Sequence, residues 1–417
     1  MAGPGSIWNI FKNMGYTTLF GLENCDHFFS KTIGQKLEVD HTIRSFYCAA
    51  QDFLGFRTAK DAVLKQRCIG DHMSHYYILN YTLAYSNLYK DLNQWIYLHI
   101  NTAHEATGLH ANTLDLDLVD FLKQYLNTFK DSHDVAIFLH ADHGMRYGNW
   151  YKDYEAYMEN KLPAFFLIAN NELLNSIENS YDSLEHNSKV LTTKPDLRTA
   201  ALYLAGLPYG VEYDVHEDPR YSAFFNLFKE KVPKTRTCES SEIPSEFCSC
   251  KKMVEVTENM LEADQELQRL VETIAEIAVY KMNSEVHTPK NMEAGIFCQK
   301  LSFKKVKRVF ATRVTDFIEQ FYVTFNVDQS PEAEFEVIAN VGTDLYNQLL
   351  KVSESKGGAF SYVYRSFPVR IKTLGINRKD PYAGPCERLT RPHSIHPPYC
   401  ICHSIDNIKE KYPSLIN

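Results

Sequence analysis

In the first half of the chain, helical stretches alternate with short apolar runs. Three runs of β-branched and aromatic side chains predict buried strands, at 95–100, 135–140 and 164–169. Between the first two runs, apolar residues recur at helical spacing over 114–129. A strand-helix-strand order normally gives parallel neighbouring strands, so this pattern predicts a layered α/β domain.

The pattern changes after residue 230. Residues 192–206 are typical of a turn that leads into a helix ending at Gly206. After a segment rich in Pro, Ser and Cys, residues 254–280 predict one long amphipathic helix. Alternating polar and apolar positions at 306–314 and 360–371 then predict strands.

We therefore expect two domains and a connector. A mainly parallel α/β domain should occupy 1–230, and a connector that contains cysteines should occupy 231–250. An α+β domain closed by a Cys-x-Cys motif should cover 251–402, followed by a tail at 403–417.

Composition and charge narrow the classes of protein. Of the 417 residues, 44% are hydrophobic and 23% charged, which indicates a globular protein. The formal net charge of -8 does not favour nucleic acid as a partner. The short basic run at 304–308 lies in alternating sequence and is more typical of a solvated strand face than of a polyanion site. No stretch reaches the roughly 18 to 20 apolar residues of a membrane span, and the first residues lack the apolar core of a signal peptide.

Six of the ten cysteines form two similar trios, each a single Cys followed by Cys-x-Cys. This spacing favours disulfides over zinc, whose ligands usually follow a C-x2-C pattern, although zinc or free thiols remain the alternative. Disulfides would indicate an oxidising compartment. The trios are Cys238, Cys248 and Cys250, then Cys386, Cys400 and Cys402. A glycosylation sequon also begins at Asn80.

The strongest candidate for chemistry is Asp142-His143-Gly144, directly after the second predicted strand. Ligands of open α/β sheets bind at the carboxyl ends of strands, and a neighbouring carboxylate and imidazole can share one divalent cation. An ordinary turn at a strand end is the alternative. His104 follows the preceding strand and is a candidate contact for an anionic oxygen, with a polar loop residue as the alternative. We expect His99 and His140, at strand ends, to be packing residues.

Five motifs spread over nearly the whole chain can be compared with known families. They are Gly15–Phe20, Arg67–Gly70, Asp142–Gly148 with Tyr154 and Glu159–Pro163, Arg236–Glu239 with Ile243-Pro244 and Cys248–Cys250, and Cys386 with Tyr399–Cys402. In order and register they resemble the uncharacterised sulfatase-like family of animal proteins known as domain of unknown function two-two-nine.

The resemblance implies a three-layer αβα sandwich like that of alkaline phosphatases and sulfatases. In those relatives an early acidic residue, a nucleophile and a later Asp-His or Asp-Asn pair hold a metal, which stabilises a transferred phosphoryl or sulfuryl group. By motif match, Asp142 and His143 would be the later ligands of zinc, calcium or manganese, and His104 would contact the anion. The resemblance also implies a secreted or lumenal protein.

The sequence departs from this family pattern at two places. The strand with the acidic ligand and the nucleophile should precede Gly15 by many residues, yet only fourteen stand there. Arg198 also occupies a position where relatives usually have His. We therefore expect a sulfatase-like protein that is catalytically impaired. The alternatives are a metal-dependent hydrolase or transferase of phosphate or sulfate esters, if an upstream segment exists, and an extracellular binding protein.

Overall fold

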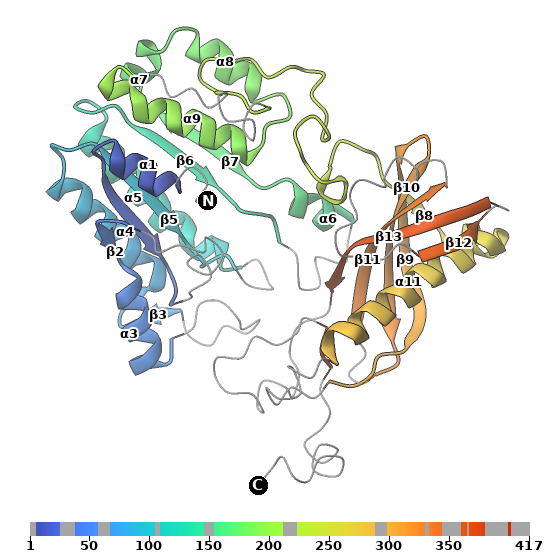
Figure 1. Cartoon of the computed structure of the whole chain (residues 1–417). Helices are drawn as coiled ribbons and strands as arrows, with labels where there is room; N and C mark the ends of the chain where they lie inside the picture. Colours follow the sequence, from blue (N-terminus) through green and yellow to red (C-terminus); the bar gives the residue numbers. More distant parts are fainter. Residues whose placement is uncertain are drawn as a thin grey trace. The chain divides into compact units, whose positions relative to one another are not determined.

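The chain folds into two compact units that are not contiguous in sequence. The first unit comprises Met1–Met145 and Leu162–Ile243, and the second comprises Arg146–Lys161 and Pro244–Asn417. The structure is a computed structural model (Figure 1). It describes residues 6–25, 38–56, 67–104, 109–145, 154–211, 223–287, 298–329, 333–343, 360–364, 367–379 and 399–401.

A parallel sheet of three strands forms the centre of the first unit. Its order is β2 (His41–Thr42), β1 (Thr17–Leu22) and β5 (Gln94–His99). Both neighbours of β1 run parallel to it, with Leu19 opposite His41 and Thr17 opposite Gln94. The carboxyl ends of β1 and β5 therefore lie side by side, which is the edge where open α/β sheets bind ligands.

Helices cover both faces of this sheet (Figure 1). On one face, α1 (Ile7–Asn13) and α9 (Lys194–Gly206) pack against Trp95 of β5. On the other, α3 (Arg44–Leu54), α4 (Ser74–Leu88) and α5 (Ala111–Phe129) pack around Leu98. Gly21 allows this close packing, because a Cβ there would come within 2.8 Å of the Leu98 side chain. The prediction of a mixed α/β domain with a parallel sheet is confirmed.

The second and third predicted strands of the first unit pair with each other. They are β6 (Ala136–His140) and β7 (Phe165–Ala169), and they run antiparallel. Among the described residues, no backbone ladder joins β6 to β5, so the expected parallel pairing of these two strands is wrong. Burial still brings them to one core, because Phe138 of β6 and Trp95 of β5 pack against the same residues of α1 and α9. Shorter elements complete the unit: β3 (Cys68–Ile69), β4 (His72–Met73), α7 (Asn171–Ser176), α8 (Ser180–Asn187) and η2 (Leu207–Tyr209).

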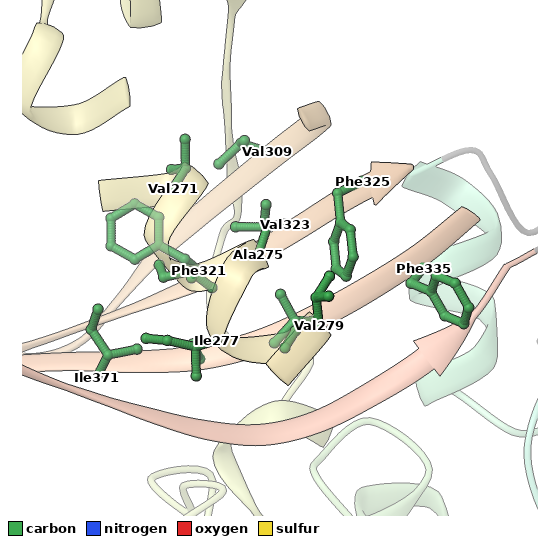
Figure 2. Packing of buried hydrophobic residues seen from close by; sticks show 14 of the residues in the cluster. Val271, Ala275, Ile277, Val279, Val309, Phe321, Val323, Phe325, Phe335 and Ile371 are labelled. Atoms are coloured by element: carbon green, nitrogen blue, oxygen red, sulfur yellow. The ribbon is translucent and has the colours of Figure 1, made fainter. Parts of the chain in front are cut away.

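The second unit contains an antiparallel sheet with the order β12-β13-β11-β10-β9-β8. The strands are β8 (Val254–Val256), β9 (Phe303–Thr315), β10 (Ile318–Val327), β11 (Glu334–Thr343), β12 (Phe360–Tyr364) and β13 (Phe367–Arg378), and the helices are α6 (Tyr154–Lys161), η4 (Ser245–Phe247), α10 (Glu258–Ala263) and α11 (Gln265–Val286). Figure 2 shows α11 packed on one sheet face, with Ala275 and Val279 against Val323 and Phe325. This apolar interface is the core of the unit.

Two predicted elements of this unit are each divided. The expected helix at 254–280 begins instead with strand β8, which pairs with β9. Thr257 caps α10 by accepting a hydrogen bond from the Met260 N–H, and Asp264 starts α11 by accepting from Leu267 N–H at 2.9 Å. The expected strand at 360–371 is a hairpin of β12 and β13. Local polar caps, which interrupt a long amphipathic period, account for the first difference.

Candidate functional site

The Asp142-His143 pair lies where the sequence predicts it, directly after β6. The Asp142 Oδ1 atom accepts a hydrogen bond from the His143 backbone N–H at 3.0 Å. The His143 Nδ1 atom lies 2.6 Å from the carbonyl oxygen of Gly144. A carbonyl oxygen only accepts, so Nδ1 carries the proton, and the lone pair of a neutral ring is on Nε2. That Nε2 atom is 3.5 Å from Asp142 Oδ2.

The groups around the Asp142 carboxyl favour its ionised form. Burial acts to raise its pKa, but the adjacent His143 ring and backbone N–H lower it below the usual range. His99 and Lys194 act in the same direction. The Lys194 ammonium also donates a hydrogen bond to the backbone oxygen of Asp142. Burial and the Asp142 charge together raise the pKa of Tyr97 on β5 to about 12.

His99, which we expected to be a packing residue, belongs to this electrostatic cluster. Burial lowers its pKa, while Asp142 and a hydrogen bond to the Asn101 side chain oppose that change. Its ring is therefore favoured in the neutral form near pH 7. Its position in the sequence could have identified it as a site residue, because His99 is the last residue of β5. Side chains at the carboxyl ends of parallel strands are candidates for ligand binding.

His104 lies in an exposed turn after β5. Its backbone N–H donates to the carbonyl oxygen of Asn101 at 2.8 Å, which closes the turn. Contact of its side chain with an anion, next to His143, stays a prediction.

A buried carboxylate that the sequence analysis missed organises the same sheet edge. Glu23 follows β1 and is fully buried. Its Oε2 atom accepts from the backbone N–H groups of Asn101 and Thr102, at 2.6 and 2.9 Å. The Thr102 hydroxyl donates to Oε1 at 2.9 Å, and the Ser74 hydroxyl donates to it as well. Glu23 therefore fixes the backbone of the loop after β5. Burial raises its pKa, although these hydrogen bonds oppose the effect.

A second set of hydrogen bonds continues from this carboxylate toward the surface. The Thr102 hydroxyl lies 2.9 Å from Nδ1 of the buried His75. The His75 Nε2 atom lies 2.7 Å from Oδ2 of Asp117, which is partly exposed on α5. Nothing in the spacing of these residues along the sequence indicates the network, because it joins four separate segments.

Asp196, in the Asp-Leu-Arg segment that differs from the expected family pattern, has a structural role. It forms a capping box with Thr193 at the start of α9. It also binds the Arg236 guanidinium with both oxygens, at 2.7 and 3.2 Å, and both side chains are buried. The family motif around Arg236 is thus joined to α9 by a buried ion pair.

Six of the eight described cysteines are disulfide-bonded. The members of the predicted trios in this group are Cys238, Cys248 and Cys400. Cys400 pairs with Cys298, and Cys25 pairs with Cys48, two cysteines that the sequence analysis did not single out. Because bonded sulfurs are not thiolates, the zinc alternative is not supported at Cys238 and Cys248.

The prediction that all six trio cysteines form disulfides is wrong for Cys250. This residue has a free and exposed thiol, although its sulfur is one of a close group with those of Cys238 and Cys248. Cys386 and Cys402 lie outside the described residues. The spacing of cysteines predicts that disulfides exist but not which pairs form.

The glycosylation candidate Asn80 is exposed in the middle of α4. The hydroxyl of the sequon's Thr82 is buried and donates to the Ile78 carbonyl oxygen at 2.8 Å. Modification of Asn80 stays a prediction.

A family profile described as "Protein of unknown function (DUF229)" matches residues 5–307. This match covers more than half of the chain, and the protein therefore belongs to that family, whose function is unknown. No curated protein and no solved structure matches the chain. Among the helices that the structure describes, none has the length and apolar character needed to cross a membrane.

Proposed function

We propose that this chain is a sulfatase-like protein that binds a divalent metal ion at Asp142 and His143. The single observation that supports this most is the 3.5 Å separation of Asp142 Oδ2 and His143 Nε2. Two ligand atoms that each lie about 2.1 Å from a tetrahedral ion are about 3.4 Å apart. When the His143 ring is neutral, Asp142 Oδ2 and His143 Nε2 both carry lone pairs, which repel each other. A cation between the two atoms would attract both lone pairs.

The donor set of one carboxylate and one imidazole fits zinc or manganese better than calcium, which takes oxygen ligands. Asp142 is ionised, and the carbonyl oxygen of Gly144 selects the His143 tautomer that leaves Nε2 free for a metal. In the described part of the chain, no third His, Cys, Asp or Glu ligand atom completes this pair. Water or the ligand would then fill the remaining positions.

The ligand in this proposal is a phosphate or sulfate ester that is bound without being cleaved. A bound metal would offset the negative charge of the ester oxygens. Lys194 adds a positive charge beside Asp142, and His104 is the predicted contact to the anion. Among the described residues, the groups that hydrogen-bond to Asp142 or shift its pKa belong to His143, His99 and Lys194, and none of these is a Ser, Thr or Cys nucleophile. The disulfides fit action in an extracellular or lumenal compartment.

The test is calorimetric titration of the full chain with Zn²⁺, Mn²⁺ and Ca²⁺. Asp142→Asn and His143→Gln should each weaken binding at least about tenfold, because each removes one of two ligands. The matched control is Asp131→Asn, which changes an exposed carboxylate on the surface of the same unit and should leave affinity unchanged. Wild-type protein that binds none of the three ions, or variants with unchanged affinity, would contradict the proposal.

A metal-dependent hydrolase or transferase is the second candidate function. His99 favours it, because a buried imidazole with a lowered pKa, beside the pair, is suited to accept a proton. Turnover of p-nitrophenyl phosphate and p-nitrophenyl sulfate distinguishes the two functions. Turnover by the wild type that disappears in Asp142→Asn would establish the enzyme and reject the non-catalytic form of the first proposal.

A further inference from the structure

The Asn101 side chain has an unused hydrogen-bond donor inside the protein. Asn101 follows β5 by two residues and is only 6% exposed. Its Nδ2 atom is buried and has no partner among the residues that the structure describes. Buried amide groups are nearly always hydrogen-bonded, so an unpartnered one at the binding edge of a sheet indicates a missing acceptor.

The orientation of this amide follows from its hydrogen bond to His99. The side chains of Asn101 and His99 are hydrogen-bonded to each other, and Nδ2 is the Asn101 atom that has no partner among the described residues. The bond is therefore made by the amide oxygen Oδ1, which accepts from a ring N–H of His99. The amide oxygen is therefore occupied, and the two N–H groups on Nδ2 remain for another molecule.

Glu23 holds Asn101 in this position. Its carboxylate accepts the backbone N–H groups of Asn101 and the next residue, Thr102, at 2.6 and 2.9 Å. With the backbone fixed on one side and Oδ1 bonded on the other, the amide cannot turn away to find a different partner. Such a preorganised donor is suited to bind an acceptor with little loss of entropy.

The neighbourhood of Asn101 favours an acceptor with negative charge. His99 links Asn101 to Asp142, since it bonds the first side chain and interacts electrostatically with the second. The Lys194 ammonium binds the backbone oxygen of Asp142 and brings positive charge to the same edge. A metal at Asp142 would add more positive charge, whereas a cation could not use an N–H donor.

We propose that Asn101 is a binding residue whose Nδ2 donates a hydrogen bond to an oxygen of a tetrahedral anion, phosphate or sulfate, at the Asp142-His143 edge. This inference rests on the proposed function, because it supplies the protein's own contact to the ligand that the metal attracts.

The test uses the full chain with saturating Mn²⁺ and measures the affinity for inorganic phosphate and inorganic sulfate by calorimetry. Asn101→Ala should weaken binding of the anions about tenfold to a hundredfold, the usual cost of losing a hydrogen bond to a charged group. Asn101→Asp keeps the acceptor for His99 but replaces the donor by a negative charge. It should weaken anion binding further and leave Mn²⁺ binding equal or tighter, a pattern that a merely structural role would not produce.

The matched control is Asn87→Ala, which removes an exposed amide from α4 and should change neither affinity. If Asn101→Ala fails to fold, as judged by circular dichroism, the nearly isosteric Asn101→Asp decides the test.

The outcomes separate this inference from the proposed function. Unchanged anion affinity in the folded Asn101 variants overturns the inference, as does a wild type that binds Mn²⁺ but neither anion. A wild type that binds no metal contradicts the proposed function. If that protein still binds phosphate, and Asn101→Ala weakens the binding, the inference about Asn101 is supported on its own.

Discussion

The interiors of the two units are built from different kinds of interaction. In the first unit, two carboxylates are buried with full sets of hydrogen bonds, Glu23 at the sheet edge and Asp196 at the start of α9. In the second unit, α11 and one face of the sheet meet mainly through aliphatic and aromatic side chains (Figure 2), with a hydrogen bond from Lys281 to the Thr373 hydroxyl. Burying a polar group costs free energy unless the group is hydrogen-bonded, whereas burying apolar side chains stabilises the folded state. The second unit also buries an ion pair, Lys379 with Glu336, but the hydrogen-bonded carboxylates next to the candidate site lie in the first unit.

The face of the second sheet opposite α11 carries a set of polar side chains that hydrogen-bond to one another. There the Tyr322 hydroxyl donates to Gln320 Oε1 at 2.6 Å, and the Lys161 ammonium of α6 lies 3.3 Å from the same hydroxyl. The Gln320 amide nitrogen donates to Asn340 at 2.8 Å. This face combines a small apolar cluster around Tyr322 and Ile338 with amide and hydroxyl groups that are paired with one another, so it is suited to holding α6 in place.

The largest effect should come from breaking the buried ion pair of the first unit. Asp196→Leu leaves the Arg236 charge buried without its partner and should cost about 3 to 5 kcal/mol of unfolding free energy. Urea denaturation followed by tryptophan fluorescence measures this in a Trp150→Phe background, because the other two tryptophans, Trp8 and Trp95, lie in the first unit.

The double variant Asp196→Leu with Arg236→Leu checks the cause. It removes both charges and should be more stable than Asp196→Leu alone. Asp182→Leu is the matched control, since Asp182 is an exposed partner of Lys231, and it should change stability by less than about 0.5 kcal/mol. A double variant as unstable as the single one would show that lost packing or capping, and not the unpaired charge, is responsible.

The second unit should respond to alkaline pH through Lys161. Burial lowers the pKa of this ammonium to about 8, against attraction by Glu336 and Glu246. Between that value and its usual 10.5, the folded state binds fewer protons than the unfolded state, so stability rises with pH. At about 1.4 kcal/mol per unit of pKa, the gain should reach about 3 kcal/mol.

Hydrogen exchange of peptides from the second unit, compared between pH 8 and pH 10 after correction for the intrinsic exchange rate, measures the larger part of this gain, about 2 kcal/mol. Lys161→Met should make it smaller, whereas Lys307→Met, which changes an exposed lysine on β9, should not. Burial also lowers the pKa values of Lys379 and Lys281 in this unit, so these two lysines should keep part of the rise. A Lys161→Met protein that keeps the full rise would assign it to other groups.

The spacing of apolar residues in the sequence predicted the positions of helices and strands better than it predicted which strands pair. The strands at β5, β6, β7 and β9 and the helix α9 lie close to their predicted positions, because their apolar residues repeat regularly. The partner of β6 was not predictable in the same way. Its pairing with β7 depends on which surfaces become buried together, and residues 146–161 between the two strands belong to the other unit.

The candidate site was predictable only in its local part. Asp142 and His143 are adjacent in the sequence, so their spacing alone indicated a shared role. Glu23 and Asn101 are joined by one hydrogen bond across two strands, and His99 is related to Asp142 through space. No one-dimensional pattern reports such contacts, since each of these residues alone is an ordinary polar residue at a strand end.

The smallest expected effect concerns His99, which should change the stability of the first unit at acidic pH. Burial lowers its pKa below the usual 6.5, so below about pH 6.5 the folded state binds fewer protons than the unfolded state. The contribution of His99 to the stability of the first unit is therefore greatest above this pH and decreases as pH falls, whereas the gain from Lys161 in the second unit appears at alkaline pH. Urea denaturation by tryptophan fluorescence in the same Trp150→Phe background, at pH 7.5 and pH 5.5, should show the loss. His99→Gln should make it smaller, while the exposed control His72→Gln retains it. An equal loss in His99→Gln would mean that the imidazole is not held neutral at the sheet edge, and it would remove the observation that favours a proton acceptor beside Asp142.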